Sequence, residues 1–332
     1  MKKLLATVIS AAFFFGTFAS CTGTGLTVLR VNEVTHSVFY APLYLAMEGG
    51  YFEDEGLEIK LTNGGGADKT MAALLSGGCE IAFCGPEASI YVINEGKENA
   101  PKIFAQLTKR DGSFLVGREK DDDFTWEKLE NKKVIAGRTG GVPAMTFEYV
   151  VNKHGLENGR NITLDNSVQF NLMGASFEGG NGDYVTLFEP TASEFQKLGK
   201  GYIVASVGEE SGEVPYTAFA SLTAYIAKNR DVLVKFTTAL QKAEKYISEN
   251  DADDVARKIS PQFPDTPVES LALAVESYRR IDAWKKDFSM TEEGLERLQE
   301  IMTRAGELDK KTTVDILCDN SIAKEVYKKI YG

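Results

Sequence analysis

The feature that most constrains this 332-residue sequence is a regular alternation of short strand-like and helix-like runs, separated by turns rich in glycine and proline. In the first third of the chain the expected strands are 26–33, 57–61, 79–84 and 102–107, and the expected helices are 41–47, 67–75 and 87–94. Alternation of this kind favours right-handed β-α-β crossovers and a parallel-type sheet covered by helices. The sequence therefore predicts an α/β lobe.

The same alternation occurs a second time. Its expected strands are 133–136, 161–164, 184–188 and 202–206, and its expected helices are 144–153, 171–177 and 191–198. The segments 108–117 and about 217–226 carry apolar and strand-forming residues instead of a Pro/Ser linker composition. We expect two similar lobes joined by two crossing strands, with a ligand cleft between the lobes.

The last hundred residues have a different pattern. Helical runs are expected at 229–248, 269–286 and 291–305, and no third series of strands appears. These extra C-terminal helices are therefore placed on the first lobe. The expected domains are 21–110 together with 217–332 for the first lobe, and 111–216 for the second.

The N-terminus has the pattern of an export signal. Lys2 and Lys3 precede an uncharged run, 4–18, which is shorter than the about 20 apolar residues of a membrane span but typical of a secretory signal. The stretch 18–21, FASC, resembles a bacterial lipoprotein cleavage box, although Phe18 stands where leucine is usual. We expect a signal peptide over 1–20 and a lipid anchor on Cys21, facing the extracellular side or periplasm. The alternative is an ordinary signal peptide that a cysteine happens to follow.

Charge and cysteine content exclude several functions. A formal net charge of −11 argues against binding of nucleic acid, or of an anionic bilayer, by charge. Cys79 and Cys84 would face opposite sides of one strand, with their α-carbons about 16 Å apart. A disulfide needs α-carbons within about 7 Å, so the two cannot pair in that conformation. Their C-x4-C spacing has no nearby histidine and is a poor metal site. We expect small buried thiols, no metal, no cofactor and a monomer.

Ligand contacts are expected at one edge of each sheet. In open parallel sheets, ligands bind beyond the carboxyl ends of the strands, where loops enter helices. The loops that lie there are 35–42, 63–67 and 85–87 in the first lobe, and 139–144 and 189–191 in the second. Phe39 and Tyr40 would form side walls of a cleft, and Pro42 would start the helix that follows.

Catalysis has little support in this sequence. It contains no G-x-S-x-G elbow, no phosphate loop and no dinucleotide fingerprint, and it has two histidines. His36 lies in a candidate site loop, whereas His154 lies at a helix end, where a contact with the helix dipole explains it. Glu87 and Glu189 could form an acid/base pair, but carboxylates at helix N-termini are favoured in any case. We therefore expect a binding protein with no catalytic residue.

Several stretches resemble a known family. They are FYAPLYLAMEGGYFEDEGLEIKL, GGGADKTMAALLSGGCEIAFCGPEA, NKKVIAGRTGGVPA, GDYVTLFEP and the helix AYIAKNRDVLVKFTTALQKAEKYISEN. Together they resemble the substrate-binding proteins of ABC importers for nitrate, sulfonates, taurine and thiamine-pyrimidine precursors. The resemblance implies a type II periplasmic-binding fold that closes around one small molecule and delivers it to an ABC permease and its ATPase.

The resemblance also implies ligand-binding positions, loop by loop. Beside His36, the matched residues are Phe39 and Tyr40 in the first loop, Gly65, Gly66 and Ala67 in the second, Gly85, Pro86 and Glu87 in the third, Thr139, Gly140, Gly141 and Val142 in the opposing lobe, and Glu189 before its proline. Phe188 departs from the polar residue often found before that glutamate.

The expected ligand is a small organic molecule. Helix N-termini would suit a sulfonate, taurine or nitrate, but a buried anion also needs an arginine, and the nearest is Arg138. Aromatic and acidic residues suit a flat heterocycle that donates hydrogen bonds, such as a thiamine-pyrimidine-like aminopyrimidine, and we lean towards it. A further alternative is an enzyme of the thiamine-pyrimidine synthase type, which consumes its own histidine. Its cysteine-rich iron motif is matched here by Cys79 and Cys84 alone.

Overall fold

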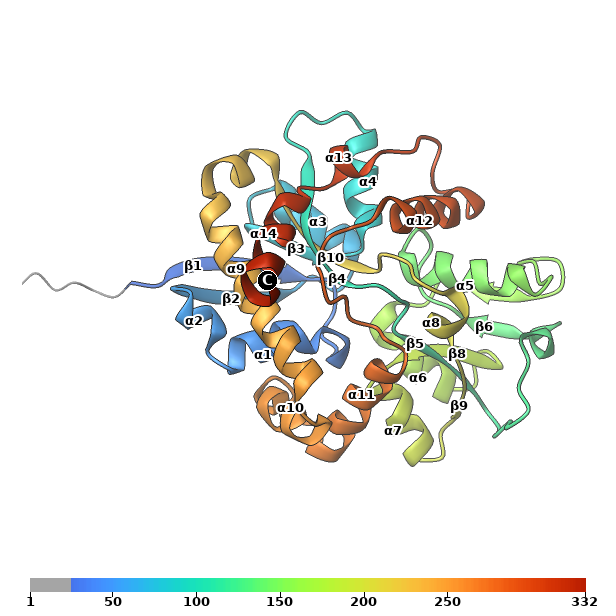
Figure 1. Cartoon of the computed structure of the whole chain (residues 1–332). Helices are drawn as coiled ribbons and strands as arrows, with labels where there is room; N and C mark the ends of the chain where they lie inside the picture. Colours follow the sequence, from blue (N-terminus) through green and yellow to red (C-terminus); the bar gives the residue numbers. More distant parts are fainter. Residues whose placement is uncertain (1–24) are drawn as a thin grey trace, which may run out of the picture.

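Two five-stranded mixed sheets form the framework of the protein in the computed structural model, which describes residues 25–332 (Figure 1). The strand orders are β2-β1-β3-β10-β4 and β7-β6-β8-β5-β9. We call the part built on the first sheet the first lobe, and the part built on the other sheet the second lobe. The strands of the first sheet are β1 (Thr27–Glu33), β2 (Leu57–Asn63), β3 (Ile81–Cys84), β4 (Pro101–Thr108) and β10 (Thr217–Leu222). Those of the second are β5 (Ser113–Gly117), β6 (Lys133–Ile135), β7 (Thr163–Asp165), β8 (Tyr184–Phe188) and β9 (Tyr202–Ser206).

Both sheets have the same topology. In each, three neighbouring strands are parallel, and the fourth strand runs antiparallel to both of its neighbours. That fourth strand is β10 in the first lobe and β5 in the second, and each enters its sheet directly after the chain has crossed from the other lobe. This arrangement confirms the predicted α/β fold class with two similar lobes.

Helices pack on each sheet. The first lobe carries α1 (Ala41–Glu48), α2 (Tyr51–Asp54), α3 (Ala67–Leu75) and α4 (Pro86–Asn94), and the second carries α5 (Val142–Lys153), α6 (Met173–Glu178), α7 (Thr191–Lys197) and α8 (Val207–Ser211). Short 3-10 turns lie at Val38–Tyr40 (η1), Trp126–Leu129 (η2), Phe170–Leu172 (η3) and Ser260–Gln262 (η4). Pro42, Pro86 and Pro143 lie in the first turns of α1, α4 and α5, where the missing N–H costs no hydrogen bond.

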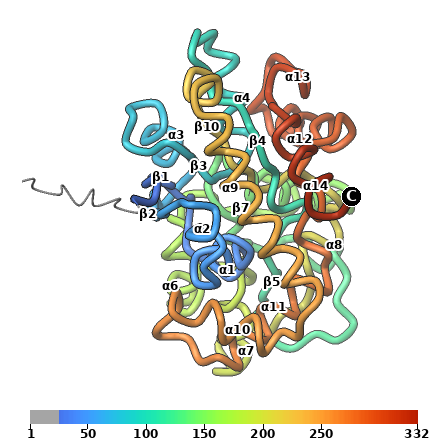
Figure 2. The backbone as a smooth tube through the Cα atoms, turned by 60° about the vertical axis from the view of Figure 1, so that its left-hand side comes forward, coloured from blue at the N-terminus to red at the C-terminus, as the bar shows by residue number. Residues whose placement is uncertain are grey.

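The C-terminal region forms α9 (Thr223–Glu249), α10 (Ala252–Ile259), α11 (Val268–Arg280), α12 (Glu292–Arg304), α13 (Val314–Leu317) and α14 (Asn320–Tyr331). As predicted, these helices cover the first lobe: α9 packs along α1, α2 and α14, as the rotated view in Figure 2 shows. In addition, α11 contacts α7 and α12 contacts α5. The tail therefore touches both lobes, which the sequence did not indicate.

Some predicted boundaries are wrong. The strand expected up to about 226 ends at Leu222, and α9 begins six residues before the predicted start at Asn229. Asn229 has non-helical angles (φ −131°, ψ 31°), so the predicted start is a kink inside a longer helix. The strand expected from Cys79 begins at Ile81, and the helix expected up to 286 ends at Arg280. Segments α2, α8, α10, α13 and α14 were not predicted.

The main apolar core runs through both lobes. One cluster of buried side chains includes Leu29 of β1 as well as Val185 of β8. The three cysteines that the structure describes, Cys79, Cys84 and Cys318, are free and buried, as expected of small apolar side chains. No helix among residues 25–332 is long and apolar enough to cross a membrane. The expected lipid anchor, Cys21, lies outside the described residues.

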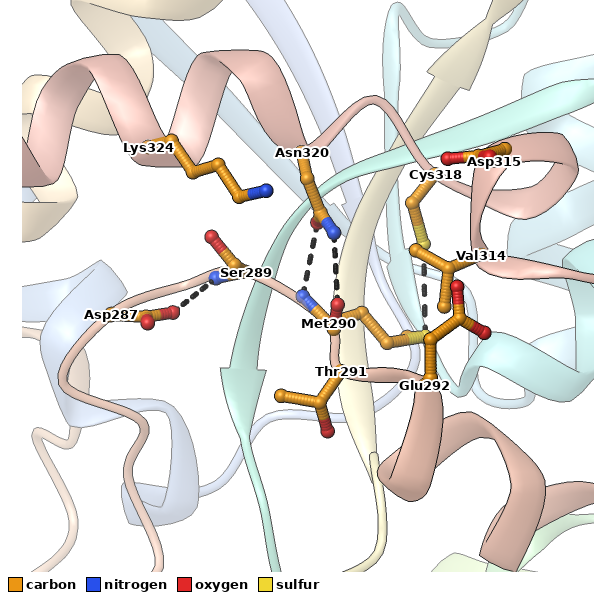
Figure 3. A pocket seen from close by; sticks show the side chains of 10 residues that line it. All are labelled: Asp287, Ser289, Met290, Thr291, Glu292, Val314, Asp315, Cys318, Asn320 and Lys324. Carbon is orange, nitrogen blue, oxygen red and sulfur yellow. Dashed lines mark hydrogen bonds between the residues drawn. The ribbon is translucent and has the colours of Figure 1, made fainter.

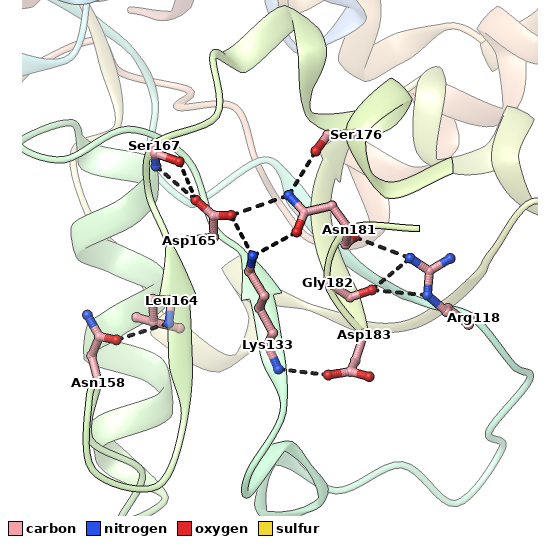
Figure 4. Close-up of polar contacts among 10 residues, drawn as sticks. All are labelled: Arg118, Lys133, Asn158, Leu164, Asp165, Ser167, Ser176, Asn181, Gly182 and Asp183. Carbon is pink, nitrogen blue, oxygen red and sulfur yellow. Dashed lines mark hydrogen bonds and ion pairs between the residues drawn. The ribbon is translucent and has the colours of Figure 1, made fainter. Parts of the chain in front are cut away.

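A polar network holds one edge of the second sheet (Figure 4). The Lys133 amine lies 3.0 Å from the Asp165 carboxylate and donates a hydrogen bond to the Asn181 side chain at 2.7 Å. Arg118 donates to the carbonyl groups of Asn181 and Gly182 just after α6. These bonds join β6, β7 and the loop before β8, and they support the strands that carry the second-lobe loops of the candidate site.

Candidate functional site

The loop from Ser37 to Tyr40 carries the predicted aromatic pair and presents Phe39 to the second lobe. The Ser37 hydroxyl accepts a hydrogen bond from the Phe39 N–H at 3.2 Å and so caps η1. Pro42 then lies in the first turn of α1, as predicted. The cap and the proline fix the loop, and the side chains of Phe39 and Tyr40 are buried (0% and 2% exposed).

Phe39 is the centre of an aromatic cluster that spans the two lobes. Its ring centroid lies 5.6 Å from that of Phe188 on β8, 5.7 Å from that of Tyr216 and 4.9 Å from that of Tyr278 on α11. The Trp284 indole N–H donates to the Phe39 carbonyl at 2.9 Å. Phe188, which departs from the family pattern, therefore packs on a predicted site residue.

Hydrogen bonds join the predicted loops of the two lobes. The Ser37 hydroxyl donates to the Glu189 carbonyl at 3.1 Å, and the Tyr91 hydroxyl on α4 donates to the Gly140 carbonyl at 3.0 Å. The Tyr278 hydroxyl accepts a hydrogen bond from the Glu189 N–H at 2.9 Å. We call the region where these loops meet the interlobe site. It comprises η1 and the loops that lead into α3, α4, α5 and α7.

Glu87 brings a buried carboxyl group into the interlobe site. It lies in the first turn of α4 and is 2% exposed. Burial raises the pKa of Glu87 to about 7, against the opposing effect of backbone N–H groups that include that of Val142 in the second lobe. Its Oε2 atom has no hydrogen-bond partner among the described residues. A Cβ atom at Gly85 would lie 1.9 Å from this oxygen, so a larger residue there would displace the carboxyl group.

Glu189 is buried as well, but its carboxylate is used inside the second lobe. Its two oxygens accept hydrogen bonds from the Ser193 N–H at 3.0 Å and the Ser193 hydroxyl at 2.7 Å, in the first turn of α7. The side chain of Glu189 therefore stabilises a helix N-terminus, where a negative charge is favoured. Its backbone, as described above, makes the contacts with the first lobe.

The glycine loops meet at the rim of the interlobe site. Gly66 has a φ of +152°, and a Cβ atom there would lie 3.1 Å from the Arg138 guanidinium of the second lobe. Arg138 lies 3.3 Å from the Asp68 carboxylate, and its side chain is 45% exposed. Gly65 and Thr139 are exposed. The arginine nearest to the predicted loops is therefore paired with an acid at the surface.

The remaining predicted positions are helix starts. Ala67 begins α3, Gly141 is the N-cap of α5, and Val142 is its first, buried residue. Gly85 and Pro86 are buried directly before and at the start of α4. The structure thus brings the loops of both lobes together at one region, as the strand-edge argument predicts.

His36 braces the site loop through both ring nitrogens. Nδ1 lies 2.8 Å from the Glu33 carboxylate, and Nε2 lies 2.9 Å from the Gln262 carbonyl oxygen. Both partners are acceptors, because Glu33 also accepts from the Tyr44 hydroxyl at 2.6 Å, so both nitrogens must donate. Burial alone would lower the pKa of His36, but these partners raise it above its ordinary value. The imidazolium therefore ties the loop to η4.

Four residues that border the interlobe site were not predicted. Asp111 and Tyr216 lie on the two segments that cross between the lobes, and both are buried. Tyr278 and Trp284 come from α11 and the segment after it, in a tail to which no site role was assigned. The Asp111-Gly112 pair between two strands was a readable turn signal. No local pattern marks the other three.

A separate cavity of about 410 Å³ lies against the C-terminal segments (Figure 3). No predicted site residue lines it. Beside it, the Asn320 side chain accepts a hydrogen bond from the Met290 N–H at 3.0 Å and donates to the Met290 carbonyl at 2.8 Å. This pair joins the start of α14 to the chain before α12 and is a structural contact.

Comparisons with solved structures agree with this fold. The periplasmic nitrate-binding protein NrtA of Synechocystis PCC 6803 matches with a TM-score of 0.74 at 16% identity, over 92% of this chain and 89% of that one. The alkanesulfonate-binding protein SsuA of Xanthomonas axonopodis pv. citri, bound to MOPS, matches with a TM-score of 0.71 at 16% identity, over 89% and 98%. At such identities the likeness concerns the fold, and it confirms the periplasmic-binding architecture.

Sequence comparisons identify the family. One relative is YtlA of Bacillus subtilis strain 168, whose name calls it a binding protein. It is 44% identical to this chain over 301 residues, which cover 91% of this chain and 90% of YtlA. The relatives named here are binding proteins and not enzymes, in agreement with the expectation from the sequence. The model of the NMT1-like family matches residues 34–260. The chain therefore belongs to the NMT1-like family.

Proposed function

We propose that this protein is the extracytoplasmic solute-binding component of an ABC importer, and that it closes its two lobes around a flat heterocycle that donates hydrogen bonds. The importer role is supported by the family and by the fold of the nitrate- and sulfonate-binding proteins. The ligand class is argued from the chemistry of the interlobe site. In this proposal the lobes are 21–110 with 217–332, and 111–216, and the protein acts as a monomer on a permease with its ATPase.

One observation carries the choice of ligand: the buried charge in this protein is acidic. Among residues 25–332, no lysine or arginine is buried, whereas the side chains of Glu33, Glu87, Asp111, Glu189 and Glu244 are. A desolvated sulfonate or nitrate needs positive charge or an arginine pair, and buried carboxylates repel it. A ligand with N–H groups gains instead, because carboxylates are strong acceptors of hydrogen bonds.

The shape of the interlobe site also favours a flat ring. Phe39, Tyr40 and Phe188 place aromatic surfaces from both lobes in one region. Aromatic pairs contribute about 0.5 to 1.5 kcal/mol each beyond the burial of area. A planar heterocycle inserted among these rings would be stacked by side chains from both lobes while its edge meets Glu87. A thiamine-pyrimidine-like aminopyrimidine combines these properties.

Attachment to the membrane is a further part of the proposal. The N-terminal pattern up to Cys21 supports a lipid anchor, with the rest of the protein outside the cytoplasm. Lipid modification with two or more chains would hold the protein firmly at the membrane. Such an anchor would keep the binding protein close to its permease.

Calorimetric titration tests the ligand class. Wild type should bind 4-amino-5-(hydroxymethyl)-2-methylpyrimidine and should not bind ethanesulfonate or nitrate. At pH 8, above the Glu87 pKa of about 7, Glu87→Gln should weaken binding of the pyrimidine about 10- to 100-fold, the effect of losing a charged acceptor. The control Glu98→Gln, on an exposed position just after α4, should bind as wild type does. Binding of ethanesulfonate or nitrate by wild type, with no binding of the pyrimidine, would favour the sulfonate or nitrate alternative and overturn the heterocycle.

A further inference from the structure

Asp111 carries a buried oxygen that the fold does not use. It lies on the segment that crosses from β4 to β5 and is 0% exposed. Its Oδ1 atom accepts hydrogen bonds from the Ser113 N–H at 2.7 Å and the Ser113 hydroxyl at 2.6 Å. Its Oδ2 atom has no hydrogen-bond partner among the described residues. An asparagine would form the same turn, so the turn explains one oxygen and leaves the other without a role.

Tyr216 lies on the segment by which the chain returns from the second lobe to β10, and it too carries a buried polar atom without a partner in the described part of the chain. Its side chain is buried, and its hydroxyl group has no hydrogen-bond partner among residues 25–332. Burial, and after it the charge of the neighbouring Asp111, raises the pKa of the Tyr216 hydroxyl well above its ordinary value. Buried polar groups are nearly always paired in folded proteins. Two unpaired groups side by side, one on each crossing, are therefore unusual.

Both groups border the interlobe site. The Tyr216 ring contacts Phe39 of the first lobe and, at a centroid distance of 6.3 Å, Phe188 of the second. Gly112, next to Asp111, lies directly against Phe39, because a Cβ atom there would be 2.6 Å from that ring.

We infer that Asp111 and Tyr216 form a second recognition point for the ligand, at the base of the interlobe site, where Asp111 Oδ2 accepts a hydrogen bond from a ligand donor and the Tyr216 hydroxyl pairs with a neighbouring polar atom of the ligand. This rests on the proposed function and makes it more specific. The ligand is a small heterocycle with donors on two edges, one directed to Glu87 and the other to Asp111. Both residues lie on the segments that connect the lobes. In this proposal those segments act as the hinge, so the contacts of Asp111 and Tyr216 with the ligand form when the lobes close.

Ligand analogues that each lack one donor test this assignment. The parent probe is 4-amino-5-(hydroxymethyl)-2-methylpyrimidine; one analogue replaces the amino group by hydrogen, and the other replaces the hydroxymethyl group by methyl. Asp111→Asn keeps the acceptor for Ser113 and should bind the parent about 10- to 100-fold more weakly, whereas Tyr216→Phe should lose about 2- to 10-fold. In wild type, each analogue should bind more weakly than the parent probe. In Asp111→Asn the loss of affinity for one analogue should disappear, and in Glu87→Gln the loss of affinity for the other analogue should disappear.

Controls separate this inference from the proposed function. Asp122→Asn changes a carboxylate whose side chain is 78% exposed and should bind every probe as wild type does. Circular dichroism and thermal unfolding without probe check that each variant is folded. If Asp111→Asn and Tyr216→Phe both bind the parent within twofold of wild type while Glu87→Gln does not, the second recognition point is refuted and the proposed function stands. If wild type binds ethanesulfonate and not the pyrimidine, the proposed function fails first.

Discussion

Replacing Glu87 by glutamine should make the protein more stable at alkaline pH. Burial raises the pKa of this carboxyl group from 4.5 to about 7 in the folded protein. Between these values the folded protein holds a proton that the unfolded chain has released. Stability therefore falls as the pH rises through this window, because the folded state must keep the group neutral or ionise it in a buried site. Glutamine has no proton to lose, and the variant lacks this dependence.

The size of the effect follows from the two pKa values. Each pH unit inside the window changes the free energy of unfolding by about 1.4 kcal/mol. Between pH 5 and pH 8 the contribution of Glu87 amounts to about 2.5 kcal/mol, because the titration is incomplete at both ends of the window. Other ionisable groups, including Asp111, titrate in wild type and variant alike, so they cancel in the difference between the two proteins.

Urea unfolding at pH 5, 6, 7 and 8 measures this difference. Circular dichroism and tryptophan fluorescence should give the same midpoint, which justifies a two-state treatment. The free energy of unfolding of Glu87→Gln minus that of wild type should grow by about 2.5 kcal/mol from pH 5 to pH 8. The exposed control Glu98→Gln should show a flat difference. A change below about 0.5 kcal/mol for Glu87→Gln would refute the reasoning, because the carboxyl group would then be solvated or paired.

Three further outcomes are expected. Cys21→Ala should move the protein from the membrane fraction to the soluble fraction, and wild type that is wholly soluble and cleaved elsewhere would contradict the lipid anchor. Phe39→Ala should lower the free energy of unfolding by about 3 to 5 kcal/mol in urea titrations, because the ring is fully buried among rings from both lobes. His36→Gln should be less stable than wild type at pH 6, and this deficit should shrink by pH 9. The raised pKa of His36 makes its contribution complete below the unfolded value of about 6.5, and it is lost as the pH rises through the folded value. An unchanged deficit at pH 9 would contradict a charged His36.

The alternation of short strands and helices was enough to predict two α/β lobes, because buried parallel strands and crossover helices have strong local patterns. Boundaries were less certain. The start of α9 was placed at Asn229, where the helix is kinked, because residues 223–228 fit a strand as well as a helix. Helix α13 has only four residues, follows a long irregular segment and packs against β4, so its local pattern alone is weak. Helix α14 was also missed, although its 12 residues have an amphipathic pattern.

The meeting of the loops was predicted where it depends on strand ends, and neighbouring residues were missed where their position depends on tertiary contact. The loops around Phe39, Glu87 and Gly140 follow from topology, since all lie beyond the carboxyl ends of strands. Tyr278 reaches the site because α11 packs against η1 and α7, a contact between segments far apart in the chain. No sequence pattern contains that information. The use of the Glu189 carboxylate in capping α7 was likewise outside the reach of the sequence.

In the proposed site, selectivity for the ligand follows from two facts: the aromatic rings already contact one another, and two buried carboxyl oxygens lack hydrogen-bond partners in the described part of the chain. Phe39, Phe188 and Tyr216 contact one another across the two lobes, so a ring that enters must replace contacts of similar strength. Stacking alone then gives little net gain. Glu87 Oε2 and Asp111 Oδ2 have no hydrogen-bond partner among the described residues, so a ligand donor that reaches either oxygen adds a hydrogen bond that the free protein lacks. A plain aromatic ring should therefore bind poorly, whereas a ring of the same size with N–H donors should bind well, and the acidic groups, more than the aromatic walls, decide which solute this protein accepts.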